Sequence, residues 1–242
     1  MMKRMMIVAI SIGLTGPVIA EEAVSTWKGE AELGFLITSG NTKKEQLSAR
    51  TKIENERDKW RHIVEIKALK SDETDALTDA TSTSAEKYEL TAKSDYKFKE
   101  FNYLFVVVNY EDDKFSGYDY RASEAIGYGN RLIHRENLTL DLEGGPGVRQ
   151  SESDAGAKKD ESMLRLSGKL EWKASKTAKF NQELTSEVGE DITITKSVSA
   201  LRNQVNGDLS SVLTLTVRNV SDVPVGVKET DTETTLALVY SF

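Results

Sequence analysis

The sequence predicts an all-β fold, namely a transmembrane antiparallel up-and-down β-barrel of about twelve strands with short periplasmic turns and longer extracellular loops. Apolar and polar residues alternate with a period of two along nearly the whole chain, as in strands that face lipid on one side and a lumen on the other. No apolar run is long enough for a membrane-spanning helix. The last residues, Leu236 to Phe242, keep the alternation and end on an aromatic ring, whereas a soluble domain usually ends in a frayed polar tail.

The N-terminus has the three parts of a secretory signal peptide. Lys3 and Arg4 form a basic start, residues 7–14 are apolar, and Val18-Ile19-Ala20 is a small-residue cleavage site. We therefore expect a signal peptide over residues 1–20 and a barrel over residues 21–242. The chain has no Cys, which excludes a disulfide framework, and its net charge of −7 argues against nucleic acid as a partner.

The first third of the chain predicts four strands. Apolar residues alternate with charged ones from Trp27, Leu47, Trp60 and Tyr88 onward, which predicts strands near 27–37, 47–54, 60–68 and 88–98. Ser39-Gly40-Asn41-Thr42 predicts a turn, because Gly and Asn accept positive φ at little cost. Polar residues predict a second turn at 56–59 and a long loop over 71–84.

The rest of the chain predicts eight more strands, near 102–111, 120–132, 137–149, 161–173, 178–188, 191–205, 209–219 and 231–242. The alternation is clearest over 161–173, where Leu164, Leu166 and Leu170 share one face. It is weakest over 191–205, because the apolar residues switch face between Ile194 and Leu201. Residues 101–108 are apolar on both faces, which predicts that side chains rather than water fill the lumen beside them.

Connection lengths and aromatic residues predict the orientation. With the N-terminus in the periplasm, the outer loops fall near 39–45, 70–85, 112–119, 150–160, 189–190 and 220–230. The inner turns, near 56–59, 99–101, 133–136, 174–177 and 206–208, are all short, which is the asymmetry of outer-membrane barrels. Trp27, Trp60 and Trp172 each fall at the inner end of a predicted strand and predict an inner aromatic girdle.

Charged residues on the inward faces form the candidate functional set. They are Lys28, Glu30, Glu32, Arg50, Lys52, Glu65, Lys67, Glu89, Lys93, Arg165, Lys169 and Glu171. Mixed signs fit either a small hydrophilic channel or a salt-bridged plug. Opposite charges on adjacent strands attract, which favours a closed or nearly closed barrel.

No pattern in the sequence predicts an enzyme, a cofactor or a metal site. Outer-membrane phospholipases and proteases need an imidazole at the outer rim, but His62 falls at the inner end of the third predicted strand and His134 in the inner turn 133–136. Metal binding by Cys or His is excluded by their numbers. Acidic residues cluster in two predicted outer loops, and they are expected to be solvated, with divalent-cation bridging to lipopolysaccharide as the alternative. The clusters are Asp72, Glu73, Asp75 and Asp79 in one loop, and Asp112 and Asp113 in the other.

Four segments together carry a family resemblance. They are Gly34 with Ser39-Gly40-Asn41-Thr42, Gly127-Tyr128-Gly129 with Arg131, Gly144-Gly145-Pro146-Gly147-Val148-Arg149, and the terminal strand. In their order and spacing the chain resembles the YdiY-like family of salt-induced outer-membrane proteins, a domain of unknown function. The resemblance implies an outer-membrane barrel with no assigned activity and offers no catalytic residues.

The terminal strand resembles the signal that outer-membrane barrels present to their insertion machinery, with Tyr240 and Phe242 as its aromatic residues. Deleting Phe242 is therefore expected to impair insertion more than the stability of a formed barrel. The expected partners are outer-membrane lipid, lipopolysaccharide and the insertion machinery, and the barrel is expected to be a monomer. A structural or envelope-stress role is favoured, with a small passive channel for ions or small solutes as the alternative.

Overall fold

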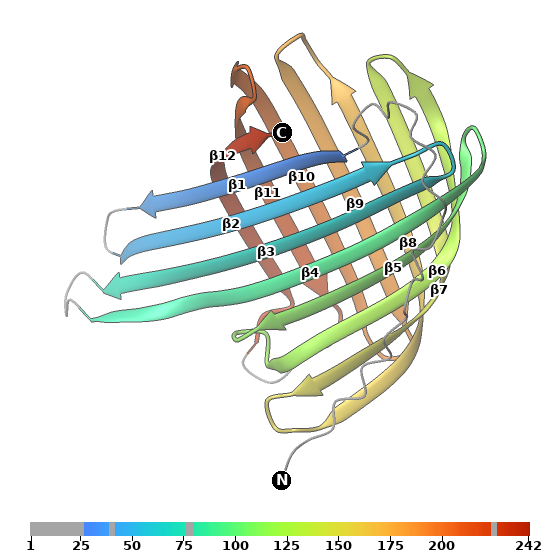
Figure 1. Ribbon diagram of the computed structural model, residues 1–242. Coiled ribbons are helices and arrows are strands. Elements are labelled where there is room, and N and C mark those ends of the chain that lie inside the picture. Colours follow the sequence, from blue (N-terminus) through green and yellow to red (C-terminus); the bar gives the residue numbers. More distant parts are fainter. Residues whose placement is uncertain (1–26, 39–41, 76–79, 224–226) are drawn as a thin grey trace, which may run out of the picture.

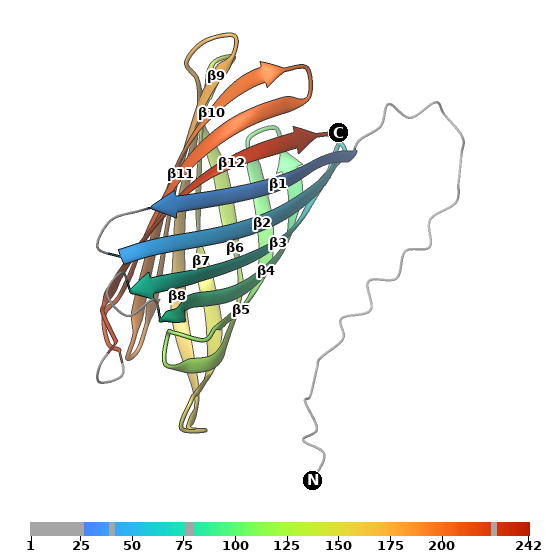
Figure 2. The ribbon, with the colours of Figure 1, turned by 90° about the vertical axis from the view of Figure 1, so that its left-hand side faces the viewer.

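Twelve antiparallel strands close into one barrel in the computed structural model, which describes residues 27–38, 42–75, 80–223 and 227–242 (Figure 1, Figure 2). The strands are β1 (Trp27–Thr38), β2 (Thr42–Glu56), β3 (Trp60–Asp75), β4 (Thr81–Lys99), β5 (Asn102–Asp113), β6 (Tyr118–Arg135), β7 (Leu138–Ser153), β8 (Lys158–Lys173), β9 (Ala178–Gly189), β10 (Thr193–Asn206), β11 (Leu209–Val220) and β12 (Thr230–Ser241). Each strand pairs with its neighbours in the chain, so the all-β twelve-stranded barrel predicted from the sequence is confirmed. The predicted signal peptide, residues 1–20, lies outside the described residues.

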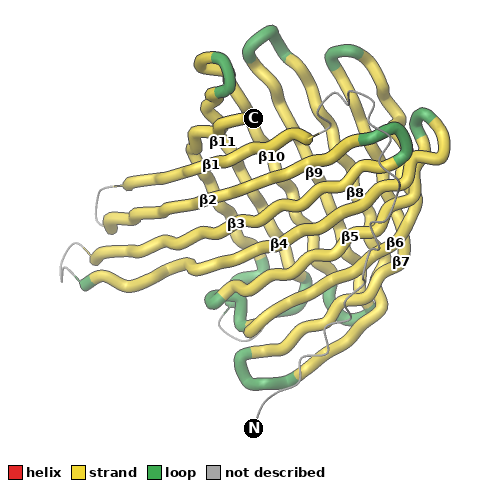
Figure 3. The backbone as a smooth tube through the Cα atoms, in the orientation of Figure 1, coloured by secondary structure: helices red, strands yellow, loops and turns green. Residues whose placement is uncertain are grey.

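The strands are longer than the sequence predicted, and the prediction of a long loop over 71–84 is wrong. β3 continues to Asp75 and β4 begins at Thr81, with Asp72 paired to Thr83. The loop expected over 150–160 is also shorter, because β7 reaches Ser153 and β8 begins at Lys158. These strand ends are polar on both faces, so they lack the alternation that identifies a strand inside lipid. Figure 3 shows how little of the described chain is left to loops.

The barrel closes where the two terminal strands meet. β12 pairs with β1 in the register Leu238 to Leu33. The main chain of Phe242 extends this pairing, since its N–H donates to the carbonyl of Gly29 at 2.9 Å and its carbonyl accepts from the Gly29 N–H at 2.7 Å. The Phe242 ring covers Gly29 so closely that a Cβ there would collide with it. The last residue therefore completes the closure.

The outward face is apolar and carries aromatic rings at its inner edge. Trp27 and Trp60 begin β1 and β3, Trp172 lies next to the end of β8, and all three are at least 44% exposed. His62 stacks on Trp60 with ring centroids 5.7 Å apart, and its Nδ1 lies 2.9 Å from the hydroxyl of Ser94. None of the described residues forms a helix with the length and apolarity that crossing a membrane requires.

β10, the strand with the weakest sequence pattern, is regular in the structure. It pairs with β9 and β11 without a break from Ile194 to Leu201. Ile194 lies opposite Glu187 and faces inward, whereas Leu201 lies opposite Phe180 and faces outward. The switch of the apolar residues is therefore a real change in the character of the two faces.

Candidate functional site

The lumen holds the charged side chains predicted from the sequence. All twelve lie at inward-facing positions, on β1 (Lys28, Glu30, Glu32), β2 (Arg50, Lys52), β3 (Glu65, Lys67), β4 (Glu89, Lys93) and β8 (Arg165, Lys169, Glu171). Lys28 is exposed at the inner end of β1, opposite Glu54 on β2. The other eleven are buried or half-buried.

Arg50 is the centre of an ion-pair network on the β1–β3 wall. Its guanidinium lies 3.2 Å from Glu30 and 3.2 Å from Glu32 on β1, and 2.6 Å from Glu65 on β3. Arg202 on β10 reaches across β11 and β12 to the second oxygen of Glu30, at 2.8 Å. The network therefore ties three neighbouring strands to a fourth that is not adjacent to them.

A second network occupies the lumen between β3 and β8, toward the inner ends of the strands. Asp95 has no exposed surface, and its carboxylate lies 2.6 Å from Arg61 and 3.2 Å from Lys93. Lys93 also pairs with Glu143 on β7, three strands away. The hydroxyl of Tyr103 donates to the same Glu143 at 2.8 Å. One lysine thus links carboxylates on two walls of the barrel.

A third network crosses the whole lumen. Lys196 on β10 lies 2.5 Å from Glu89 on β4, and Arg218 on β11 lies 3.0 Å from Glu111 on β5. In the closed order of the barrel, each of these pairs joins strands that are six positions apart and therefore on opposite walls. Arg121 on β6 adds a contact to Glu111 at 3.2 Å. We call Glu89, Glu111, Lys196 and Arg218 the transverse pairs.

The transverse pairs require an oval barrel. Twelve strands spaced about 4.8 Å apart and tilted by about 40° would close into a circle roughly 24 Å across. A lysine and a glutamate that meet end to end span only about 14 Å between their Cα atoms, given bonds of about 1.5 Å. The β4–β5 wall therefore lies close to the β10–β11 wall, and Figure 1 shows β1–β5 crossing in front of β9–β12.

Apolar side chains fill part of the lumen beside β5. Phe105 and Val107 are each 1% exposed, and with Tyr103, Ala125 and Met163 they form a cluster inside the barrel. Gly129 on β6 makes room for it, because a Cβ there would enter the ring of Tyr103. The apolar run of β5 thus packs as a small core, as the sequence suggested.

The turn between β9 and β10 is held at the outer mouth by a buried ion pair. Arg149 on β7 lies 2.6 Å from Glu161 on β8, and both side chains are at most 4% exposed. Glu161 accepts hydrogen bonds from the backbone of Asp191 and Ile192, and Arg149 donates to the carbonyl of Ile192. Lys159 bonds to the Asp191 side chain at 3.0 Å, and this hydrogen bond raises the pKa of the Lys159 ammonium.

Several members of these networks were missed in the candidate set taken from the sequence, namely Glu111, Arg121, Glu143, Arg149, Lys196 and Arg218. The signal that identifies them is the period of two. Glu143 and Arg149 lie on one face of β7, and Arg121 lies on the same face of β6 as Gly129. Arg121 and Arg149 pair with Glu111 and Glu161 directly opposite them on the neighbouring strands. The pairs Glu143–Lys93, Lys196–Glu89 and Arg218–Glu111 are not readable from the sequence, because they join strands that are not adjacent.

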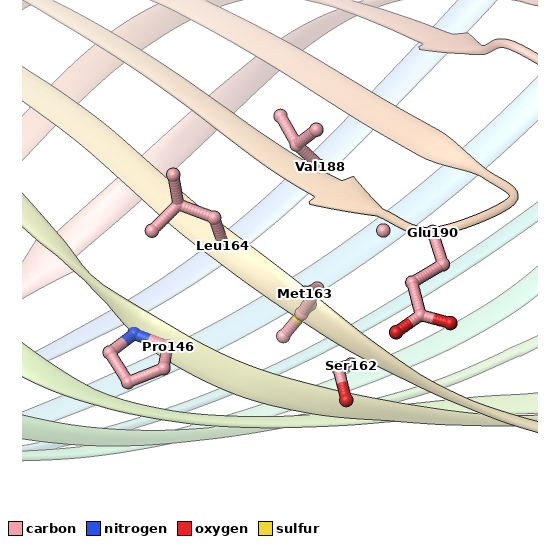
Figure 4. Close-up of a pocket in the computed structure, with 7 residues that line it drawn as sticks. Pro146, Ser162, Met163, Leu164, Val188 and Glu190 are labelled. Carbon is pink, nitrogen blue, oxygen red and sulfur yellow. The ribbon is translucent and has the colours of Figure 1, made fainter.

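The outer wall has a shallow, largely apolar hollow of about 300 Å³. It is lined by Pro146, Ser162, Met163, Leu164, Val188, Gly189 and Glu190 (Figure 4). Neither His62 nor His134 lines it, so it contains no general base of the kind that the barrel hydrolases require. In the described part of the chain, no three His, Cys, Asp or Glu side chains are grouped to hold a metal ion.

Solved structures with a similar fold are outer-membrane barrels. The translocator domain of the autotransporter NalP from Neisseria meningitidis gives a TM-score of 0.52 at 10% identity and covers 92% of this chain and 90% of its own. The NanC porin gives 0.53 at 10% identity, with 88% and 98% covered. An outer membrane channel from Pseudomonas putida F1 gives 0.52 at 12% identity, with 93% and 100% covered. At these identities the likeness concerns the fold.

Sequence comparison identifies the family. The uncharacterized protein YdiY of Escherichia coli (strain K12) is 29% identical over 220 residues, which cover 90% of this chain and 84% of YdiY. A family model described as "Protein of unknown function, DUF481" matches residues 31–242. The chain therefore belongs to this family, as its resemblance to the YdiY-like proteins suggested.

Proposed function

We propose that the protein is a non-enzymatic barrel of the bacterial outer membrane whose lumen is closed by its own ion pairs, with a structural or envelope-stress role. The transverse pairs carry this proposal, because Glu89–Lys196 and Glu111–Arg218 join opposite walls. The apolar cluster around Phe105 and the turn held by Arg149 block further parts of the same lumen.

Energetics favour keeping these pairs closed. An ion that passes this level has to separate a carboxylate from its cation inside a narrow, partly desolvated space. Leaving one partner of a buried pair uncompensated costs about 3–5 kcal/mol. Glu89 and Glu111 are 21% and 15% exposed, so they lie between the surface and the fully buried case. Separating the pairs therefore costs free energy, and this cost favours the closed state of the lumen.

A small passive channel for ions or small solutes is the second candidate function. It is supported by the mixed charges that line β1–β4 and by the likeness of the fold to the NanC porin and to the outer membrane channel from Pseudomonas putida F1. In this case the transverse pairs would open under a voltage or a solute, and would form the selectivity-determining constriction of the pore.

Planar-bilayer recording of the purified protein separates the two functions. We expect no steady conductance from the wild type. The double variant Lys196→Ala/Arg218→Ala removes both transverse cations and should conduct. Lys169→Ala is the matched control, because the ion pair of Lys169 is with Glu171 of its own strand, at 2.9 Å, and does not cross the lumen. A stable open channel in the wild type would contradict the closed barrel and support the passive channel.

The proposed location in the outer membrane is supported by the apolar outward face and by the aromatic rings at its inner edge. The proposal also includes the cleavage of residues 1–20 on export and the contact of the barrel with lipid and lipopolysaccharide. Heat-modifiable migration of the outer-membrane fraction tests it, and recovery of the folded protein from the soluble periplasm would contradict it. The family resemblance also implies that salt induces the protein. This is tested by measuring the protein level as the external salt concentration rises.

A further inference from the structure

One part of the outward face is polar at membrane depth. On β9 and β10 the polar outward side chains include Gln182, Ser186, Thr195, Ser197 and Ser199, which we call the polar stripe. None of the five carries a charge, and all five are half-buried by their neighbours. Leu184 of β9, opposite Ser197, is the apolar outward residue among them and is 51% exposed. The adjacent strands present the usual apolar face, with Leu164 and Leu166 on β8 and Leu213 and Leu215 on β11, each at least 42% exposed. The polar stripe therefore lies between two pairs of exposed leucines, which we call the leucine rims.

The stripe lies within the apolar belt, on the extracellular side of the inner aromatic girdle. Phe180 pairs with Trp172 of the girdle, and Gln182 is the next outward-facing residue along β9. Ser199 lies opposite Gln182, and Thr195 lies opposite Ser186, four residues further toward the outer end. Since strands rise about 3.3 Å per residue and the apolar belt is about 25 Å tall, the stripe extends from the inner part of the belt toward its middle.

Hydrogen bonds within the stripe use only part of its capacity. Ser199 donates to the side-chain oxygen of Gln182 at 2.5 Å. The Gln182 side-chain amide donates to the Ser197 hydroxyl at 3.0 Å and to the backbone carbonyl of Glu183 at 3.2 Å, so the unused capacity lies mainly in the hydroxyls. The hydroxyls of Ser186 and Thr195 are 3.1 Å apart. A carboxamide offers two N–H donors and two acceptor lone pairs, and each hydroxyl both donates and accepts. Lipid tails supply no partner for the remaining groups, so exposing them to lipid is unfavourable.

We infer that the stripe is the interface at which two copies of this chain associate side by side in the membrane. This inference rests on the proposed membrane location, but it does not depend on whether the lumen conducts. It replaces the monomer expected from the sequence.

Symmetry selects a second copy as the occupant. Two copies inserted in the same direction are related by a two-fold axis along the membrane normal, so every residue meets the partner's surface at its own depth. A hydroxyl or carboxamide can bond to its own symmetry mate, because it is both donor and acceptor. A stripe of carboxylates or ammonium groups would instead repel its copy. The leucine rims of β8 and β11 then pack around the polar contact as an apolar border.

Cysteine cross-linking in native membranes tests the interface directly, since the chain contains no Cys. Ser197→Cys should form a disulfide-linked dimer on mild oxidation, because a residue near the two-fold axis lies close to its own copy. Ala49→Cys, outward-facing on β2 and far from the stripe around the barrel, is the matched control and should stay monomeric. Equal dimer yields from both sites, no dimer from Ser197→Cys, or a cross-link from Ser197→Cys to a different protein would overturn the inference.

The mass of the folded protein in mild detergent gives a second readout. The wild type should be dimeric, and Ser197→Leu/Ser199→Leu should weaken the dimer at least tenfold while keeping heat-modifiable migration. Ala49→Leu/Thr51→Leu adds two leucines to the outward face of β2 and should leave the dimer intact. A monomeric wild type would contradict the interface. Bilayer conductance is read separately, so an error in the proposed lumen function would appear there and not in the mass.

Discussion

At the scale of single residues, Arg149 and Glu161 show how a buried pair controls a turn. Glu161 bonds to two backbone N–H groups of the β9–β10 turn as well as to Arg149. Arg149→Ala would leave this carboxylate buried without its cation, and we expect a loss of about 3–5 kcal/mol of stability. The loss is measured as a lower temperature for the gel-mobility shift. Lys158→Ala is the control, because Lys158 is 67% exposed and its pair with Glu152 is worth only about 0–1 kcal/mol.

Phe242 allows insertion to be separated from stability. Its main chain closes the barrel through Gly29, but its ring is 67% exposed. Phe242→Ala keeps the main-chain bonds and removes only the ring, so it is a cleaner change than deletion. We expect a lower amount of folded protein in the outer membrane and little change in the unfolding of the protein that has inserted. Equal membrane levels for the variant and the wild type would show that the ring is not an assembly signal.

At the scale of elements, β5 tests whether the lumen is packed or filled with water. Phe105 faces inward and is 1% exposed, while Leu104 beside it faces outward and is 49% exposed. Phe105→Ala should cost about 3–5 kcal/mol if the ring is packed as in a protein core. Leu104→Ala should cost clearly less, because lipid fills the space it leaves. Unfolding in urea from lipid vesicles compares the two, and equal small losses would indicate a hydrated lumen.

The elements were predictable from the sequence wherever lipid imposes a pattern. Strands such as β8 alternate because each outward position meets lipid and each inward position meets the lumen. The ends of β3 and β4 could not be recognised, because beyond the lipid both faces tolerate Ser, Thr and Asp. β10 gave a weak signal for a different reason, since Ser197 and Ser199 place polar groups where apolar ones are expected. Departures from the pattern thus mark either the membrane boundary or a special surface.

At the scale of the whole molecule, the oval cross-section of the barrel is the property that the sequence could not predict. The inward position of Glu89 follows from its own strand, but its partner Lys196 comes from the opposite wall. Such a pairing exists only after the barrel closes and depends on the shear of all twelve strands. The pairing of neighbouring strands gives the strand count and the closure, whereas the distance between the two walls is bounded by the ion pairs that join them.

Distances between spin labels test the oval section directly. Labels at Tyr110 and Val217 lie beside Glu111 and Arg218 and report the distance across the narrow axis. Labels at Phe35 and Val148 report the distance between β1 and β7, which are also six strands apart. An oval barrel requires the first distance to be shorter, by more than roughly 5 Å on the strand spacing and tilt used above.

Unlabelled protein is added in excess so that only distances within one copy are read. In Lys196→Ala/Arg218→Ala, which lacks both transverse cations, the first distance should lengthen toward the second, because no attraction then holds the β4–β5 wall against the β10–β11 wall. Equal distances in the wild type would mean a round barrel, and the transverse pairs could not form in it. A narrow wild type whose distances do not change in the double variant would instead show that strand pairing alone sets the shape.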